Sequence, residues 1–189
     1  ITLKASDGTT VEFYDEIKAQ GGVKDVYFST DKTYVVAFYR DPLNVNDKER
    51  VKNIVGTYRE RIFTNTPDGK YWKDLFPWPS KMVEWNGKTG IVMPFYDKKF
   101  FFNGGPFDGK EKNGKWFASA KLRNRFLPAD QKGNWLTHLH LCIKIARAIR
   151  RLHAAGLAHS DLSYNNVLID PITGSACVID CDSLVVPGK

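Results

Sequence analysis

Three oxygen-bearing side chains in the last third of the chain have the types and the spacing that phosphoryl transfer requires. Asn166 follows Asp161 by five residues, and Asp180 comes after two short apolar runs at 167–169 and 177–179. An aspartate can orient and deprotonate a hydroxyl nucleophile, whereas an asparagine and a second aspartate can hold the Mg²⁺ ions that bridge nucleotide phosphates. Mg²⁺ prefers such hard oxygen ligands. The pattern therefore predicts a catalytic base at Asp161 and metal ligands at Asn166 and Asp180.

The same residues also suit an ordinary turn, because Asp, Ser and Asn are frequent in turns and helix caps. Their context argues for more than a turn. A helix is expected to end at 152–157, His159 and Asp161 follow at once, and an apolar hairpin is expected to carry Asn166 and Asp180. This combination favours phosphoryl transfer.

The stretch 159–166, together with Asp180, resembles the catalytic loop and the D-F-G motif of the eukaryotic-type protein kinases. The resemblance covers nearly the whole chain. It departs from the family pattern at Ser160, where Arg is usual, at Ser163, where Ser/Thr kinases commonly have Lys, and at 181–182, where Cys-Asp replaces Phe-Gly. The change at Ser160 implies activity that does not depend on a phosphorylated activation loop.

The expected order of elements fits this resemblance. Runs of β-branched and aromatic residues predict strands, and an Asn-Gly pair between two apolar runs predicts a hairpin. The expected elements are an antiparallel meander with strands at 11–17, 25–29 and 34–39, a helix from about 46 to 63, hairpin strands at 82–85 and 90–93, and a helix from about 135 to 155.

The fold class that we expect is α+β and protein-kinase-like. Residues 1–94 would form an N-terminal lobe, with a five-stranded antiparallel sheet plus one helix. Residues 95–189 would hold the hinge, a basic insertion and a truncated, mainly helical C-terminal lobe. The start at Ile1 predicts a fragment or a processed chain, and the end at Lys189 implies that the rest of the kinase domain is absent.

The sequence also predicts where the two helices, at about 46–63 and 135–155, begin and end and which of their faces are buried. Asn46 or Asp47 is expected to cap the first, and Gly156 is expected to end the second as a left-handed cap. Residues 65–70 are expected to form a loop, and 95–115 to be irregular. Apolar residues at helical spacing predict the buried faces. These are Val51, Val55, Tyr58 and Ile62 in the first helix, and Leu139, Cys142, Ile143, Ala146, Ile149, Leu152 and His153 in the second.

The resemblance implies a site for ATP and Mg²⁺. It places Gly21 and Gly22 in the loop that covers the phosphates, where glycines let backbone amides approach closely. Each implied residue also suits an ordinary turn or a plain core. The adenine slot is implied to have Val26 and Val35 as its roof, Leu168 as its floor, Met93 as the gatekeeper and Phe95 in the hinge.

The lysine with which the family clamps the nucleotide phosphates is missing. Aligning 34–36 with the family's V-A-x places Ala37 at the position expected to be Lys. Three explanations stay open: an engineered replacement of the lysine, a natural pseudokinase, or a charge supplied from Arg40 or Lys24. Arg40 lies three residues on and so points to the opposite face of a regular strand, which weakens it.

The family's clamp lysine pairs with a helix glutamate, for which Glu49 and Glu60 are the candidates. Both lie roughly opposite the apolar stripe of their helix, by the 100° advance per residue. Glu60 has the better sequence distance from the third strand. It would need an irregularity at Gly56 to turn inward.

The net charge of +7 suits an anionic partner. The basic residues gather at 98–99 and 110–125, where aromatics interleave, so a nucleic-acid-binding module is a rival interpretation. No recognised nucleic-acid motif is present, however. We expect a basic, solvated insertion over a hydrophobic floor rather than a nucleic-acid surface.

Cysteine use and hydropathy point to the cytoplasm. Two of the three cysteines, Cys142, Cys177 and Cys181, sit in apolar runs, which indicates buried free thiols in a reducing compartment. No apolar run approaches the length of a membrane span.

The spellings at 78–79 (Trp-Pro) and 92–94 (Val-Met-Pro) resemble a bacterial branch of the kinase family. Some of that branch is encoded in tellurite-resistance and stress loci, beside a metal-dependent phosphatase and a von Willebrand A-type protein. The resemblance implies transfer of the ATP γ-phosphoryl group to Ser or Thr of a protein substrate, with this form impaired by Ala37 and by the truncated C-terminal lobe. The alternatives are a pseudokinase scaffold that binds nucleotide or partners, and the nucleic-acid-binding module.

Overall fold

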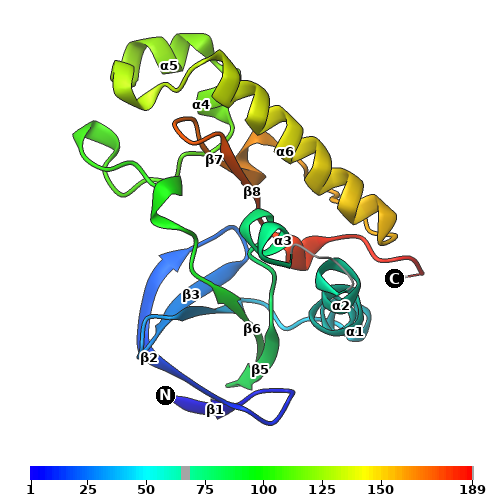
Figure 1. Ribbon diagram of the computed structural model, residues 1–189. Coiled ribbons are helices and arrows are strands. Elements are labelled where there is room, and N and C mark those ends of the chain that lie inside the picture. Colours follow the sequence, from blue (N-terminus) through cyan, green and yellow to red (C-terminus); the bar gives the residue numbers. More distant parts are fainter. Residues whose placement is uncertain (65–68, 189) are drawn as a thin grey trace. The chain divides into compact units, whose positions relative to one another are not determined.

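The computed structural model describes residues 1–64 and 69–188, which divide into two compact units. Unit 1 contains residues 1–64, 78–95 and 186–188, and unit 2 contains 69–77 and 96–185 (Figure 1). Residues 69–77 thus group with unit 2, although they fall inside the expected lobe at 1–94. The two units are described separately below.

Unit 1 is built on one antiparallel sheet with the strand order β1-β2-β3-β4-β6-β5. The sheet has one strand more than the five expected, because the N-terminal residues pair with β2 through Leu3 opposite Val11. At three residues this edge strand is too short to give a period-two signal in the sequence. The strands are β1 (Thr2–Lys4), β2 (Thr10–Gln20), β3 (Lys24–Ser29), β4 (Tyr34–Tyr39), β5 (Lys81–Trp85) and β6 (Lys88–Pro94).

The two faces of this sheet carry different cores, since side chains alternate along each strand. One face is aromatic, with Phe13, Tyr27 and Phe38 packed together and Trp85 against them at ring distances of 5.5–5.8 Å. A Cβ at Gly90 would lie 2.6 Å from the Phe38 ring, so this position requires glycine. The other face is aliphatic and packs against the helix that follows β4.

That helix runs without interruption through three segments, α1 (Val45–Asn53), the π-helical η1 (Ile54–Tyr58) and α2 (Arg59–Phe63). Its N-cap is Asn44, whose Oδ1 accepts a hydrogen bond from the backbone nitrogen of Asp47 at 2.8 Å. The expected cap at Asn46 or Asp47 was therefore wrong by two to three residues, because Asn44 has the extended backbone that a cap needs. The π segment also shifts the fully buried position from Val55 to Ile54.

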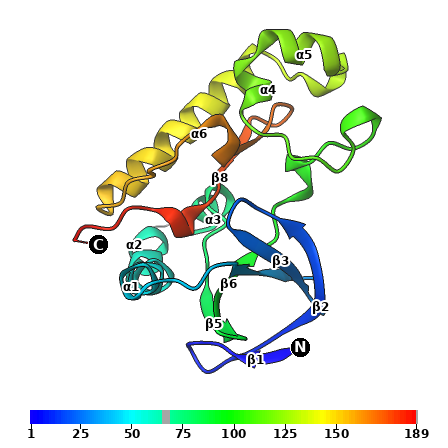
Figure 2. The same cartoon turned by 180° about the vertical axis from the view of Figure 1, so that it is seen from behind.

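Unit 2 combines helices with a small hairpin, and α6 runs alongside that hairpin in both views (Figures 1 and 2). The elements are α3 (Gly69–Leu75), η2 (Lys98–Phe100), η3 (Gly105–Phe107), α4 (Lys115–Ala118), α5 (Ala120–Phe126), η4 (Ala129–Gln131), α6 (Trp135–Ala154), η5 (Tyr164–Asn166), β7 (Val167–Asp170), β8 (Ser175–Val178) and η6 (Cys181–Ser183). The expected irregular course of 95–115 is confirmed. In the expected loop at 65–70, residues 65–68 lie outside the described part, and Gly69 and Lys70 instead begin α3.

The ends of α6 follow from capping residues, but its buried face differs from the expected one. Asn134 forms a capping box with Thr137, and Gly156 follows the helix at φ 81°, which confirms the predicted left-handed end. The fully buried positions are Leu141, Ala148 and Leu152. Five members of the expected face are exposed instead, namely Leu139, Cys142, Ile143, Ala146 and His153. The helix has two apolar stripes, and only the one that contains Leu141 and Ala148 is covered. No helix among the described residues has the length and apolarity to cross a membrane.

Candidate functional site

The hairpin of unit 2 brings together chain segments that are far apart in sequence. Val167 of β7 pairs with Val178 of β8, so the residue before β7 meets the residue after β8. The backbone nitrogen of Ile179 accordingly donates to the carbonyl of Asn166 at 3.0 Å. The hairpin register therefore sets Asn166 and Asp180, which are 14 residues apart, at the same end of the hairpin.

Asp161 is joined directly to this end of the hairpin. The amide nitrogen Nδ2 of Asn166 donates to Asp161 Oδ2 at 2.9 Å and to the Asp161 carbonyl at 2.7 Å. With Nδ2 committed to these acceptors, the amide oxygen Oδ1 is the atom through which Asn166 can bind a cation. Asp161 itself is exposed, as a group that must meet a substrate hydroxyl has to be.

Asp180 holds an unusual backbone conformation. It sits in the left-handed region at φ 61° and ψ 38°, and Ser183 Oγ donates to its Oδ2 at 2.7 Å and to its carbonyl at 2.8 Å. A left-handed residue with a Cβ costs roughly 1–2 kcal/mol, and Asp and Asn tolerate it best. Such strained positions cluster at functional sites. Sequence reasoning did not find Ser183, which orients the carboxylate.

The histidine of the loop ties it to the hairpin at a second point. His159 Nε2 lies 2.9 Å from the carbonyl of Ile179, the residue that also bonds Asn166. Beyond the loop, the backbones of Ala158 and Val185 pair through bonds of 2.8 and 3.3 Å. The loop and both strand ends thus form one hydrogen-bonded assembly, in which the chain around Asp161 is fixed from both sides.

The oxygen atoms of Asn166 and Asp180 are a donor set that suits Mg²⁺. No group of three or more His, Cys, Asp and Glu side chains gathers for a metal in the described residues 1–64 and 69–188. Mg²⁺ commonly takes only one or two protein oxygens and completes its shell with phosphate oxygens and water. One carboxylate from Asp180 and the amide oxygen of Asn166 fit that requirement. ATP would supply the remaining anionic ligands.

In unit 1, four of the residues predicted to contact the nucleotide lie on the aliphatic face of the sheet. Val26 pairs with Ala37, and Val35 pairs with Met93, and all four belong to one cluster. Val26 and Val35 are only partly buried there. Phe95, which directly follows β6, packs edge-on against Phe28 with 4.8 Å between the ring centres. Unit 1 therefore brings Val26, Val35, Ala37 and Met93 to a common face.

The glycine turn between β2 and β3 is held by an arginine that the sequence pattern did not assign to it. The guanidinium of Arg40 donates to the carbonyls of both Gly21 and Gly22, and its Nε lies 3.8 Å from Asp25 Oδ1. Its backbone nitrogen donates to the carbonyl of Val23 at 3.0 Å. Both glycines are exposed, and Arg40 fixes the path of the turn.

The residues expected around the missing lysine are less favourably placed. Ala37 is 4% exposed and packs among apolar side chains, so no charge stands at this position. The irregularity required at Gly56 is present as the π-helical segment Ile54–Tyr58. Glu60 nevertheless remains exposed, and so does Glu49.

Leu168, the predicted adenine floor, is fully buried among Phe100, Cys177 and Ile179 of unit 2. Burial in this cluster raises the pKa of the Cys177 thiol to about 12. Cys181 is buried as well, whereas Cys142 is exposed.

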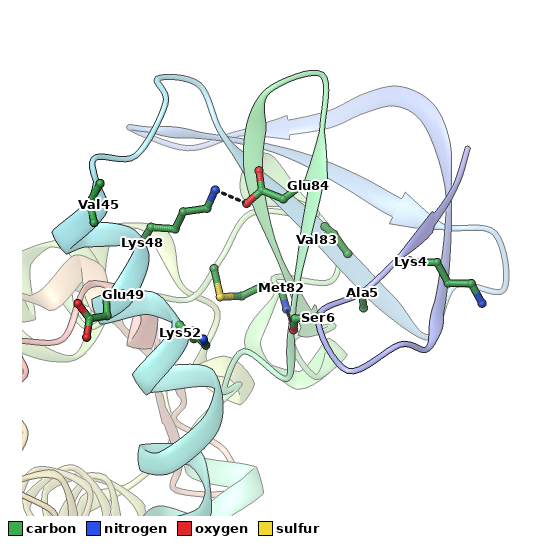
Figure 3. A pocket seen from close by; sticks show the side chains of 10 residues that line it. All are labelled: Lys4, Ala5, Ser6, Val45, Lys48, Glu49, Lys52, Met82, Val83 and Glu84. Atoms are coloured by element: carbon green, nitrogen blue, oxygen red, sulfur yellow. Dashed lines mark hydrogen bonds and ion pairs between the residues drawn. The ribbon is translucent and has the colours of Figure 1, made fainter.

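A separate hollow of about 520 Å³ lies in unit 1 between α1 and β5, and its lining includes Glu49, one of the two glutamates considered as partners of the clamp lysine (Figure 3). Met82 and Val83 form its apolar part, and Lys48 reaches across to Glu84 at 2.9 Å. The full lining consists of Lys4, Ala5, Ser6, Val45, Lys48, Glu49, Lys52, Met82, Val83 and Glu84.

The basic aromatic stretch after the hinge forms a small core of its own. Trp116 packs edge-on against Phe102 at 5.1 Å and against Phe107 at 4.9 Å, and Phe102 and Trp116 are each 5% exposed. Lys110 and Lys115 lie over these rings, as cations often do on aromatic faces. Phe102 and Trp116 are therefore not exposed for base stacking.

The chain matches no protein-family model and no curated protein sequence. Its structure, in contrast, is similar to solved kinases. The Toxoplasma gondii specific rhoptry antigen kinase domain matches over 100% of this chain with a TM-score of 0.56 and 16% identity. The structure of vaccinia related kinase 3 matches over 97% with a TM-score of 0.54 and 10% identity.

The fold is kinase-like. This confirms the expected fold class, with an antiparallel sheet and a helix in one unit and a mainly helical second unit. The chain spans about half the length of these structures, 55% of the first and 51% of the second. At such low identity the likeness concerns the fold alone, so the function has to be argued from the site.

Proposed function

We propose that this chain binds Mg-ATP and belongs to a Ser/Thr protein kinase, which transfers the γ-phosphoryl group to a hydroxyl of a protein substrate. In this proposal Asp161 orients and deprotonates the hydroxyl, while Asn166 and Asp180 hold Mg²⁺. Gly21 and Gly22 cover the phosphates.

The observation that carries the proposal is the assembly of Asp161, Asn166 and Asp180 at one end of the β7–β8 hairpin. The Asn166 amide nitrogen donates to Asp161, so the amide oxygen Oδ1 is the atom that can face a metal ion. The left-handed backbone of Asp180 is compatible with a functional role, because strained backbone positions cluster at active and ligand-binding sites. A kinase-like fold around this assembly supports the same conclusion.

The aliphatic face of unit 1 supports the adenine part of the proposal. Val26, Val35 and Met93 lie together there, and the first two keep part of their surface exposed. Small-molecule sites are mostly apolar with a few well-placed polar groups, which suits a purine ring. Phe95 belongs to the segment that would offer backbone hydrogen bonds to adenine.

Thermal unfolding with and without nucleotide tests the proposal. A ligand that binds only the folded state raises the melting temperature, and the increase grows with the ratio of ligand concentration to dissociation constant. Mg-ATP should raise it clearly more than ATP with a chelator, because the metal links the phosphates to Asn166 and Asp180. Equal shifts with and without Mg²⁺ would contradict the metal assignment.

The variant Asp180→Asn separates metal binding from folding, because asparagine tolerates the left-handed backbone as well as aspartate does. It should lose the Mg²⁺-dependent part of the shift and keep the shift that adenosine produces. Asp130→Asn, which changes an exposed carboxylate of η4 in the same unit, is the matched control and should behave like the parent protein.

A pseudokinase scaffold is the second candidate, and the burial of Ala37 among apolar side chains favours it. Such a protein would bind nucleotide or partner proteins without transferring phosphate. Measurable incorporation of phosphate from Mg-ATP into a protein or peptide that depends on Asp161 would separate the two candidates.

Finer assignments extend the proposal. The spellings at 78–79 and 92–94 support a bacterial kinase that works beside a metal-dependent phosphatase and a von Willebrand A-type protein, as in tellurite-resistance loci. The buried cysteines Cys177 and Cys181 are in the thiol form, which suits a reducing, cytoplasmic setting. Co-purification of these partners with the protein from its own cells would test this extension.

A further inference from the structure

The sheet of unit 1 places a second basic residue beside the position that lacks its lysine. Lys24 of β3 pairs with Tyr39 of β4, and two residues further along Val26 pairs with Ala37. Side chains two residues apart on a strand share a face, so Lys24 lies on the same face as Val26 and Ala37. Diagonal neighbours across two strands are within reach of long side chains. The Lys24 ammonium can therefore supply positive charge close to Ala37, where the predicted lysine is missing.

One contact of Lys24 is with an aromatic ring of the neighbouring strand. Its Nζ lies 5.4 Å from the centre of the Tyr39 ring, and the residue is half-buried. A cation over a tyrosine ring gains only about 0.5–1 kcal/mol at an exposed site. A phosphate, as a full anion, interacts with an ammonium more strongly than the ring does. Lys24 thus lies beside Tyr39, on the face of the sheet that also carries Val26 and Ala37.

The glycine turn ends at this lysine. The backbone nitrogen of Gly21 donates to the carbonyl of Lys24 at 2.9 Å, which closes the turn that the proposed function assigns to the phosphates. Lys24 therefore sits where that turn rejoins the sheet.

Arg40, the other nearby cation, has a different role. By strand alternation it lies on the face of Val36 and Phe38, opposite to Ala37. Its guanidinium bonds the carbonyls of Gly21 and Gly22 and lies beside the buried Asp25. Arg40 consequently shapes the turn.

We infer that Lys24 supplies, from β3, the positive charge that contacts the α- and β-phosphates of a bound adenine nucleotide. The inference rests on the proposed function, because it names the cation of that same nucleotide site. With the charge supplied by Lys24, a lysine on β4 is not needed, and the apolar Ala37 is compatible with phosphate binding.

Adenosine and Mg-ADP are the probes that test the inference, since only the second carries phosphate. In the variant Lys24→Gln, the affinity for Mg-ADP by calorimetry should fall at least about tenfold, or about 1.4 kcal/mol, with the affinity for adenosine unchanged. Lys88→Gln removes the same charge from the β5–β6 end of the sheet and should leave both affinities as in the parent. Lys24→Arg should keep most of the Mg-ADP affinity.

Moving the charge back to β4 completes the test. The double variant Lys24→Gln with Ala37→Lys should regain Mg-ADP affinity relative to Lys24→Gln alone, because the same face then carries one ammonium again. An unchanged Mg-ADP affinity in Lys24→Gln overturns the inference and leaves the proposed function intact. Equal losses for adenosine and Mg-ADP also overturn it, since they show a structural role. If the parent binds neither probe, the proposed function fails together with the inference.

Discussion

The two units meet the chemical demands of a kinase-like site in different ways. In unit 2, Asp161, Asn166 and Asp180 are each held by short hydrogen bonds, and the assembly contains the residue types that phosphoryl transfer needs. In unit 1, the residues that we propose for the adenine form an apolar cluster, and Ala37 stands at the position where the kinase pattern predicts a lysine. The three polar residues of unit 2 are thus fixed by hydrogen bonds, whereas the cluster of unit 1 is fixed by packing.

This difference shows which functional residues must stand at one fixed position and which can be supplied from a neighbouring position. A metal ligand needs one atom at one place, so a hairpin register and a few hydrogen bonds must fix it. A phosphate-neutralising charge acts over a longer distance, so more than one position on a sheet face can supply it. The site in unit 2 therefore keeps to the family pattern at its three polar positions, while unit 1 departs from it at Ala37.

The largest effect is expected from the base of unit 2. Asp161→Asn should lower phosphate transfer from Mg-ATP to a Ser/Thr peptide by about 100- to 10,000-fold, the usual contribution of a general base. Mg-ADP affinity should change little, since the variant keeps the metal ligands. If Asp161→Asn leaves the transfer intact, the measured activity comes from another kinase in the sample. The proposed role of Asp161 in unit 2, and with it the contrast between the two units, would then be wrong.

The packing of the two units can be compared with one core truncation in each. Leu168→Ala should lower the free energy of unfolding in urea by about 2–5 kcal/mol, because the buried leucine leaves a cavity under the hairpin. Val36→Ala is the counterpart on the sheet of unit 1, fully buried and smaller, and should cost less. A loss below about 1 kcal/mol for Leu168→Ala would show that the hairpin core is not tightly packed.

The buried thiol of unit 2 gives the stability a dependence on alkaline pH. The pKa of Cys177 is about 12 in the folded chain against 9.0 for an ordinary thiol, because burial disfavours the thiolate. The folded-state pKa is the raised one, so its stabilising contribution is present below about pH 9 and is lost as the pH rises towards 12. The urea midpoint should therefore fall over this range, and less steeply in Cys177→Val. Identical slopes for the two proteins would exclude Cys177 as the cause.

The smallest effect is expected from the basic aromatic stretch. Replacing Lys110, which is exposed, and Lys115, which is half-buried, by Gln should leave Mg-ADP affinity within about twofold, because physiological salt screens charges outside the nucleotide site. Lys112 is kept, since its Nζ donates to the carbonyl of Lys99 at 2.9 Å and lies 3.8 Å from Asp170. Single-stranded DNA should bind weakly. A sub-micromolar affinity that falls steeply with salt would instead support the nucleic-acid interpretation.

Sequence patterns predicted most of the fold because its signals are local. The meander, the Asn-Gly hairpin and the left-handed end of α6 at Gly156 follow from periodicity and turn chemistry, and the structure has them all. Local signals gave the wrong residues where the sequence offers more than one helix cap or more than one apolar stripe. Asn44 is the helix cap instead of Asn46 or Asp47, and the stripe with Leu139 and Ile143 is exposed although its spacing resembles that of a core.

By itself, the sequence determined the residue types of the candidate site and the order of the elements that carry them, since spacing and hydropathy are properties of the chain. Only the tertiary structure decided which atoms meet. The register of β7 and β8 joins Asn166 to Ile179, and the pairing of β3 with β4 sets Lys24 on the face of Ala37 and Arg40 on the other. Strand register and hydrogen-bond partners depend on contacts between residues far apart in sequence, and a single sequence does not record them.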